Sequence, residues 1–149
     1  MAFRGQAEYS IDSKGRVAIP AKMRAAMSEA AGGRFVALYS WDPGLHLYPV
    51  DVWAEKEADL KRLNQYRAEN REAIRRLFMN TEDVELDSQG RITLTKTLLE
   101  KANLTVSSSA RILGAGERIE IWNPAVLDDS INRPSEQSEL LIDRTFGGL

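Results

Sequence analysis

The chain of 149 residues contains no cysteine and a single histidine, His46. The first absence excludes disulfide bonds, thiolate metal sites and a cysteine nucleophile. Because His46 is the single histidine, no second imidazole can join it as a metal ligand, and it lies between Leu45 and Leu47 in a strand-like stretch. We therefore expect no catalytic residue, no metal site and no cofactor.

Long apolar runs are also missing. The N-terminal segment Met1–Gln6 is short and polar, unlike a signal peptide, and no run has the length needed to cross a bilayer. The sequence thus predicts a cytoplasmic protein without a membrane partner. Glycine-rich phosphate loops, serine elbows and metal-ligand spacings are absent as well, so we expect no small-molecule substrate.

An excess of positive charge is lacking, because 20 basic residues face 22 acidic ones and the net charge is −2. This balance argues against a chain-wide field that collects nucleic acid. The charges are unevenly distributed, however. Residues 1–34 hold six basic and three acidic residues, whereas residues 128–149 hold two basic and five acidic ones. Because phosphate binding depends on potential within about 8 Å, the N-terminal segment remains a candidate for binding DNA.

One pattern occurs twice. The segment Asp12–Ile19 reads DSKGRVAI, and Asp87–Leu94, 75 positions later, reads DSQGRITL. Each copy follows an alternating stretch and precedes a short helix-like segment and two apolar runs, so a unit of about 45 residues is repeated. Each unit is predicted as strand, turn, strand, helix, strand, turn, strand, with Gly15 and Gly90 allowing hairpin reversals. The fold class is mainly β with α (α+β).

Four segments follow from this pattern. We predict a first unit at 7–54, a helical connector at 55–82, a second unit at 83–126 and an acidic tail at 127–149. The charged connector has apolar residues at helical spacing, with Asp51 as a candidate N-cap. Asn123 and Pro124 indicate a helix start after the second unit. The tail is predicted either as partly disordered chain or as a docked helix.

The repeated loops have a structural and a binding interpretation. Asp12 and Asp87 are expected to accept backbone hydrogen bonds within their own turns. Arg16 either pairs with the aspartate of its loop or offers its guanidinium to phosphate and guanine, and the same choice holds for Arg91. Lys14 lies at the tip of the first loop, where the second has Gln89. If DNA is the ligand, the first loop contributes more electrostatic affinity.

Three tryptophans have two interpretations. Trp41, Trp53 and Trp122 offer stacking surfaces for bases, but their positions at strand ends and a helix start favour packing in the core or at an interface.

Together these features resemble a known family. The opening Phe3-Arg4-Gly5, the motif from Asp12 to Pro20, the charged connector, the second motif and the strand Ile119–Trp122 are similar to MraZ, a family of bacterial transcriptional regulators. The resemblance covers residues 3 to about 127. Thr95 lies near a position where the family commonly has proline.

The resemblance implies two tandem SpoVT-AbrB-like domains of swapped-hairpin type. They would form an intrachain double-hairpin β-barrel with amphipathic helices after each unit, assembled as a ring-shaped homo-oligomer, an octamer or a dodecamer. It also implies binding to double-stranded DNA with short direct repeats upstream of the division and cell-wall gene cluster that includes its own gene. The action there is mainly repression, which places the protein at the nucleoid.

The resemblance implies that Arg16 and Arg91 contact DNA, with Lys14 as an adjacent basic residue. With Arg4 and Gln89 added, the candidate DNA-binding residues are Lys14, Arg16, Arg91, Arg4 and Gln89. The residues that hold the turns would be Asp12, Gly15, Asp87 and Gly90.

One alternative function remains open. The double motif and its helices would then build a non-catalytic oligomeric scaffold for protein interactions, in which the arginines only brace their turns. This alternative predicts oligomers with no preference for an operator.

Overall fold

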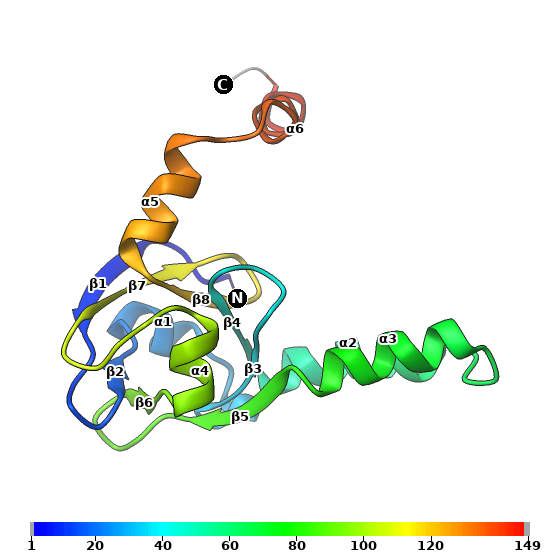
Figure 1. Cartoon of the computed structure of the whole chain (residues 1–149), viewed down its shortest axis with the longest axis horizontal. Coiled ribbons are helices and arrows are strands. Elements are labelled where there is room, and N and C mark those ends of the chain that lie inside the picture. The colour runs from blue at the N-terminus through cyan, green and yellow to red at the C-terminus, as the bar shows by residue number, and fades with distance from the viewer. Residues whose placement is uncertain (1, 148–149) are drawn as a thin grey trace.

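The computed structural model describes residues 2–147, in a body of strands and short helices from which two helical extensions project (Figure 1). The first unit comprises β1 (Gln6–Ser10), β2 (Arg16–Ala18), α1 (Ala21–Ala26), the 3-10 turn η1 (Glu29–Ala31), β3 (Arg34–Leu38) and β4 (Leu45–Pro49). The second comprises β5 (Thr81–Glu85), β6 (Arg91–Thr93), α4 (Lys96–Lys101), β7 (Ser109–Gly114) and β8 (Ile119–Trp122). The α+β class and the repeated order of elements are confirmed.

The two units exchange strands. A six-stranded antiparallel sheet has the order β1-β7-β8-β4-β3-β5, and β2 pairs with β6 in a separate ribbon. β1 of the first unit therefore pairs with β7 of the second, and β5 of the second with β3 of the first. The local hairpins expected at Gly15 and Gly90 are wrong. The two strands that each loop joins pair with strands of the other unit and not with each other.

The exchange creates one core from both units. Its fully buried side chains include Phe35 and Leu45 from the first unit and Ile92, Ile112 and Ile121 from the second. About 45 residues alone bury too little apolar surface for independent stability, so sharing the core removes that limit. No pairing between β1 and β5 closes the large sheet within residues 2–147, and the closed barrel remains a prediction.

A second, smaller cluster covers the other face of β3 and β4. Val36, Leu38 and Tyr48 pack there against Trp53 of α2 (Val50–Lys61). Successive strand residues point to opposite faces, so Phe35 and Ala37 enter the main core while their neighbours meet the helix. This part of the sheet is buried on both sides.

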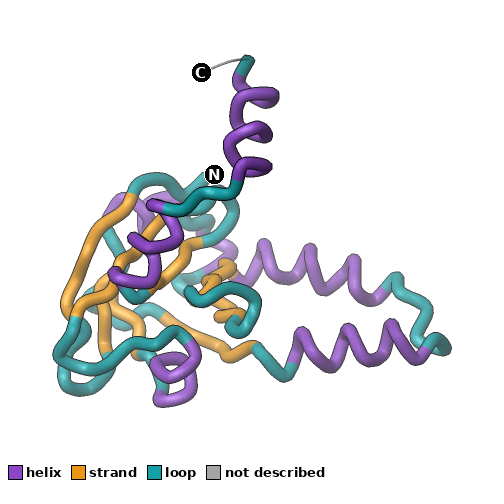
Figure 2. The backbone as a smooth tube through the Cα atoms, turned by 45° about the horizontal axis from the view of Figure 1, so that its top comes forward, coloured by secondary structure: helices purple, strands orange, loops and turns teal. Residues whose placement is uncertain are grey.

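The connector forms two helices, α2 and α3 (Ala68–Phe78), which project from the body as an arm joined by a loop at its tip (Figure 2). α2 begins earlier than expected. Pro49 is its N-cap, and Asp51 lies in the first turn, where its Oδ2 accepts a hydrogen bond of 2.7 Å from the Ser28 hydroxyl. Proline suits this boundary because it cannot donate a backbone hydrogen bond.

Two other helix starts follow the sequence. Asn123 caps α5 (Pro124–Asn132) by accepting from the backbone N–H groups of Ala125 and Val126. Thr95, where the family commonly has proline, caps α4 by accepting from Leu98 N–H at 3.3 Å. The tail continues as α6 (Glu136–Phe146), a helix that stands away from the body in Figures 1 and 2. No helix of residues 2–147 is both long and apolar enough to cross a membrane.

The strand exchange predicts that neither half folds alone. Residues 1–79 lack β7, the partner of β1, and β5, one of the two partners of β3; residues 80–149 lack β3, the partner of β5, and β1, one of the two partners of β7. Each fragment should show no cooperative thermal transition by circular dichroism, whereas an equimolar mixture should recover one. A cooperative transition in either isolated fragment would contradict the shared core.

Candidate nucleic-acid interface

The first loop is closed by its own aspartate. Asp12 Oδ1 accepts hydrogen bonds from the backbone N–H groups of Lys14, at 2.9 Å, and Arg16, at 2.8 Å. Arg16 Nε donates to Asp12 Oδ2 at 2.6 Å. Gly15 has φ +80°, and a Cβ there would lie 2.7 Å from the Leu94 carbonyl oxygen. Only glycine fits this position without strain.

The second loop repeats this geometry. Asp87 Oδ1 accepts from Gln89 N–H at 2.8 Å and from Arg91 N–H at 3.0 Å, and Arg91 Nε donates to Asp87 Oδ2 at 3.0 Å. Gly90 has φ +75°. In both loops the aspartate accepts the hydrogen bonds of its own turn and the glycine has positive φ.

The two loops lie side by side. Leu94 N–H donates to the Gly15 carbonyl at 2.7 Å, and Ile19 N–H donates to the Gly90 carbonyl at 3.0 Å. Arg91 Nη1 is 4.0 Å from Asp12 Oδ2 in the other loop. Because β2 and β6 are antiparallel, the arrangement has pseudo-two-fold symmetry, with Arg16 opposite Thr93 and Arg91 opposite Ala18.

Both aspartates are stabilised as carboxylates. The backbone hydrogen bond from Arg16 is the main cause that holds the pKa of Asp12 below its ordinary value of 3.8. The backbone hydrogen bond from Arg91 lowers the pKa of Asp87 in the same way. Bonds from an N–H group favour the charged carboxylate, so each loop carries a fixed negative charge that orients its arginine.

The arginines remain available to a ligand. Their side chains are 32% exposed for Arg16 and 27% for Arg91, and only Nε of each is hydrogen-bonded among the described residues. The terminal Nη groups are held in a fixed direction with donors to spare. Lys14 and Gln89 are exposed at the two loop tips, as their positions in the motif predict.

The structure adds Arg24, which the motif did not assign to the site. Arg24 Nε donates to the Ile19 carbonyl at 3.0 Å, and its guanidinium is close enough to Gly90 that a Cβ there would lie 2.6 Å from Cζ. The equivalent position of the second unit, 75 residues later, is Leu99, so comparison of the two units did not mark Arg24 as a site residue. Only the basic count of the N-terminal segment pointed to this residue.

Arg4 lies elsewhere. It precedes β1, at the end of that strand away from Asp12, and lines a hollow with Lys22 and Tyr9. The structure thus brings Lys14, Arg16, Gln89 and Arg91 to one face but does not bring Arg4 to the loops.

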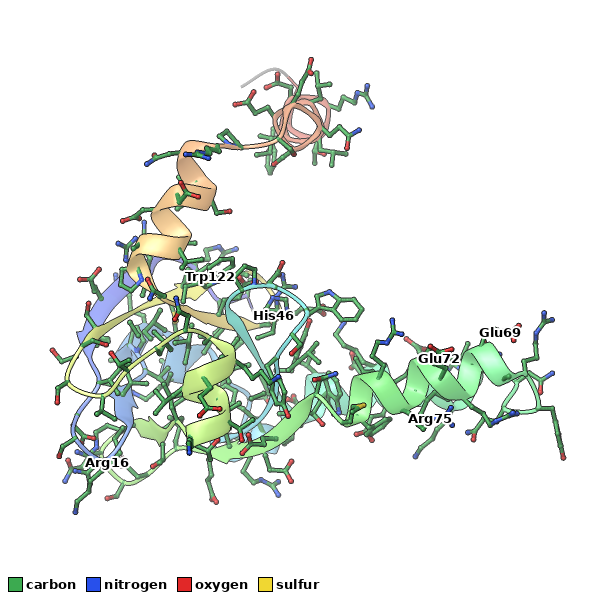
Figure 3. The ribbon with its side chains drawn as sticks, in the orientation of Figure 1. Arg16, His46, Glu69, Glu72, Arg75 and Trp122 are labelled. Atoms are coloured by element: carbon green, nitrogen blue, oxygen red, sulfur yellow. The ribbon has the colours of Figure 1, made fainter. Side chains whose placement is uncertain are left out.

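The tryptophans divide by burial. Trp53 and Trp122 are buried, but Trp41 is 68% exposed in the turn between β3 and β4. Packing in the core is therefore wrong for Trp41, whereas base stacking and packing at an interface both stay open. Figure 3 shows Trp122 near His46 and both far from Arg16.

His46 belongs to a buried polar cluster. Its Nε2 lies 2.8 Å from Asp42 Oδ2 and 3.5 Å from Glu120 Oε2. These three residues offer ligand atoms within 4.8 Å of one another, a spacing that a metal ion could use. The Glu120 oxygens, however, already accept hydrogen bonds from Trp122 Nε1 at 2.9 Å and Arg118 Nε at 2.8 Å. We interpret the cluster as a hydrogen-bonded network that joins β4 to β8.

The fold and the site define a pseudo-symmetric β-ribbon protein. Its two tandem units exchange strands, and each carries a loop in which an aspartate holds an arginine. The family model described as MraZ protein matches residues 2–76 and 77–144. Three relatives are each called "Transcriptional regulator MraZ". The protein of Moorella thermoacetica is 36% identical over 95% of each chain, and that of Desulforamulus reducens is 39% identical over 81% of each. That of Chlorobium phaeobacteroides is 32% identical over 97% of this chain and 98% of its own. The chain belongs to the MraZ family.

The loop glycines can be tested with a matched pair. Gly15 and Gly116 have nearly the same positive φ, but nothing lies within 4 Å of a Cβ at Gly116. Gly116→Ala should cost about 1 kcal/mol of folding free energy from backbone strain alone. Gly15→Ala should cost at least about 2 kcal/mol because its methyl also meets the Leu94 carbonyl. Urea unfolding measures both, and equal costs would contradict the close contact.

The carboxylates predict a pH dependence. A folded-state pKa below 3.8 means that Asp12 and Asp87 stabilise the fold above that value, and that this contribution is lost as the pH falls through the lowered pKa. The difference in unfolding free energy between the wild type and the Asp12→Asn/Asp87→Asn variant should be constant near neutral pH and should shrink below pH 3.8. Asp59→Asn on the arm controls for charge removal. A difference that persists to pH 2 would refute the assignment.

Proposed function

We propose that this chain is a sequence-specific DNA-binding regulator of transcription that acts as a repressor. The observation that carries the proposal is the pair of arginine loops at one end of the β2–β6 ribbon. The major groove of DNA admits a two-stranded ribbon, and arginine is the side chain best suited to guanine edges and to phosphates. Relatives named as transcriptional regulators support the same role.

Each aspartate prepares its arginine for this task. By binding Nε, Asp12 fixes the guanidinium plane of Arg16, so less side-chain freedom is lost when the Nη groups meet a base or phosphate. Lys14 adds a flexible positive charge at the first tip, and Gln89 offers an amide at the second. Arg24 places a third guanidinium beside the second loop. Arg4 is left outside this contact face because it lies at the far end of β1.

One chain offers few contacts, so the proposal includes self-assembly. A ring-shaped homo-oligomer would align several loop faces and make later contacts intramolecular. Repeated boxes in the operator would match the repeated faces. By resemblance to the family, we place those boxes as short direct repeats upstream of the division and cell-wall gene cluster that includes this chain's gene, with the protein at the nucleoid in the cytoplasm.

A non-catalytic scaffold is the second candidate. The Nε bonds of Arg16 and Arg91 to their own aspartates are the observation that favours it, because such arginines also brace turns. The two functions differ in what happens when a guanidinium is removed from the loop.

Arg16→Ala should weaken binding to DNA that carries the repeated boxes by about 10- to 100-fold per contacting chain, the typical value of a bidentate base contact. If Arg16 instead binds a phosphate, the slope of log affinity against log salt should fall by about 1. Both are measured by fluorescence anisotropy across a salt series.

Arg133→Ala is the matched control, since Arg133 is an exposed arginine after α5 that pairs with Asp129. It should leave affinity unchanged. Unchanged affinity and salt slope for a folded Arg16→Ala protein would favour the scaffold.

A further inference from the structure

The two projecting parts of the chain both carry apolar surface that nothing in residues 2–147 covers. On α6, Leu140, Leu141, Ile142 and Phe146 are 43%, 61%, 50% and 66% exposed. At the base of the arm, a hollow of about 400 Å³ is lined by Leu38, Trp41, Tyr48, Trp53, Leu60 and Leu63. Exposed apolar surface of this kind is costly in water and marks sites of protein interaction.

The hollow has the character of a docking site. Trp41 is 68% exposed at its rim, and tryptophan is enriched among residues that dominate binding energy. The lining is mostly apolar, whereas Lys56 and Asp59 add polar groups at the edge. Its volume suits a few apolar side chains of a docking helix better than a whole helix.

Charge complementarity indicates the occupant. The end of α2, the tip loop and α3, residues 60–80, hold six basic and two acidic residues, whereas residues 50–59 of the arm hold one basic and four acidic ones. Among the described residues, Arg75 has no ion pair, and Figure 3 shows it on the other side of α3 from Glu69 and Glu72. α6 carries Glu136, Glu139 and Asp143 in its first two turns, and these carboxylates are also without ion pairs within residues 2–147. An acidic apolar helix thus matches an apolar hollow that adjoins the basic segment 60–80.

The helix and the hollow are far apart within one chain. Figures 1 and 2 both show α6 and the arm pointing in different directions from the body. α5, which precedes α6, is fixed to the body by Arg111, whose Nη1 is 3.2 Å from Asp128 Oδ1, and by the buried Leu127. Because the helix and the hollow point in different directions on one chain, they can bind each other only between two copies.

We propose that α6 of one copy docks into the arm hollow of the next copy. Leu141, Ile142 and Phe146 supply the apolar contacts, and the α6 carboxylates lie toward the basic segment 60–80. Because the two surfaces are different, the interface is heterologous: each copy gives a helix and receives one. This inference deepens the self-assembly clause of the proposed function and rests on it.

The test uses two variants of the full chain that keep their fold because the changed side chains are exposed. Trp41→Glu/Leu63→Glu spoils the hollow, and Leu141→Glu/Ile142→Glu spoils the helix. Tyr9→Glu on β1 and Val106→Glu on the body are matched controls that add charge at other exposed apolar positions. Masses are measured without DNA by light scattering after size exclusion.

The wild type and both controls should run as multimers, and each double variant alone should have the mass of one chain. An equimolar mixture of the two double variants should double that mass and go no further, since one intact helix meets one intact hollow. A multimeric double variant, a mixture that stays monomeric, or a monomeric wild type would each overturn the proposal. Helices that pair with each other would give the first of these results, because the hollow variant keeps its helix.

The measurement is independent of DNA binding. Arg16→Ala should retain the wild-type mass, so failure of the operator assignment leaves the interface standing. Conversely, the wild type could bind operator DNA through Arg16 while the Leu141→Glu/Ile142→Glu variant keeps the multimeric mass. That result would refute only the docking of α6.

Discussion

Pairing between the two halves of the chain is the constraint on which the rest of the structure depends. β1 would have no antiparallel partner without β7, and β3 would have β4 alone without β5. The same exchange brings β2 to β6, and this short ribbon sets the two arginine loops side by side. A core of side chains from both units then fixes the ribbon. Stability and the proposed binding face therefore come from one set of long-range contacts.

The loops show how an acidic chain can present basic groups. Each loop contains an aspartate, so the formal charge of the loop is small. The carboxylate, however, accepts hydrogen bonds from backbone N–H groups of its own turn. The arginine is bound to that carboxylate through Nε alone, and its Nη groups keep their donors for a ligand. The net charge of −2 therefore says little about what a ligand at this face would meet.

Local signals predicted local structure well. The doubled motif gave the order of elements in each unit, and Gly15, Gly90 and Asn123 have the turn and cap roles that their chemistry indicates. Strand partners were harder, because alternation shows which face of a strand is buried but not which strand lies beside it. The hairpins expected at the loops failed for that reason. Arg24 and the helical order of residues 136–146 lacked any repeat to mark them.

Joining the two units in one chain has a consequence for how they change over time. In a dimer of identical subunits, every substitution appears at both symmetric positions. Here the positions are encoded separately, so Lys14 and Gln89 differ, as do Arg24 and Leu99, while the fold stays pseudo-symmetric. The proposed binding face consequently has a polarity, with Lys14 at one end and Arg24 beside Gly90 at the other. A face with a direction is suited to boxes that all run the same way, whereas an identical pair would favour palindromes.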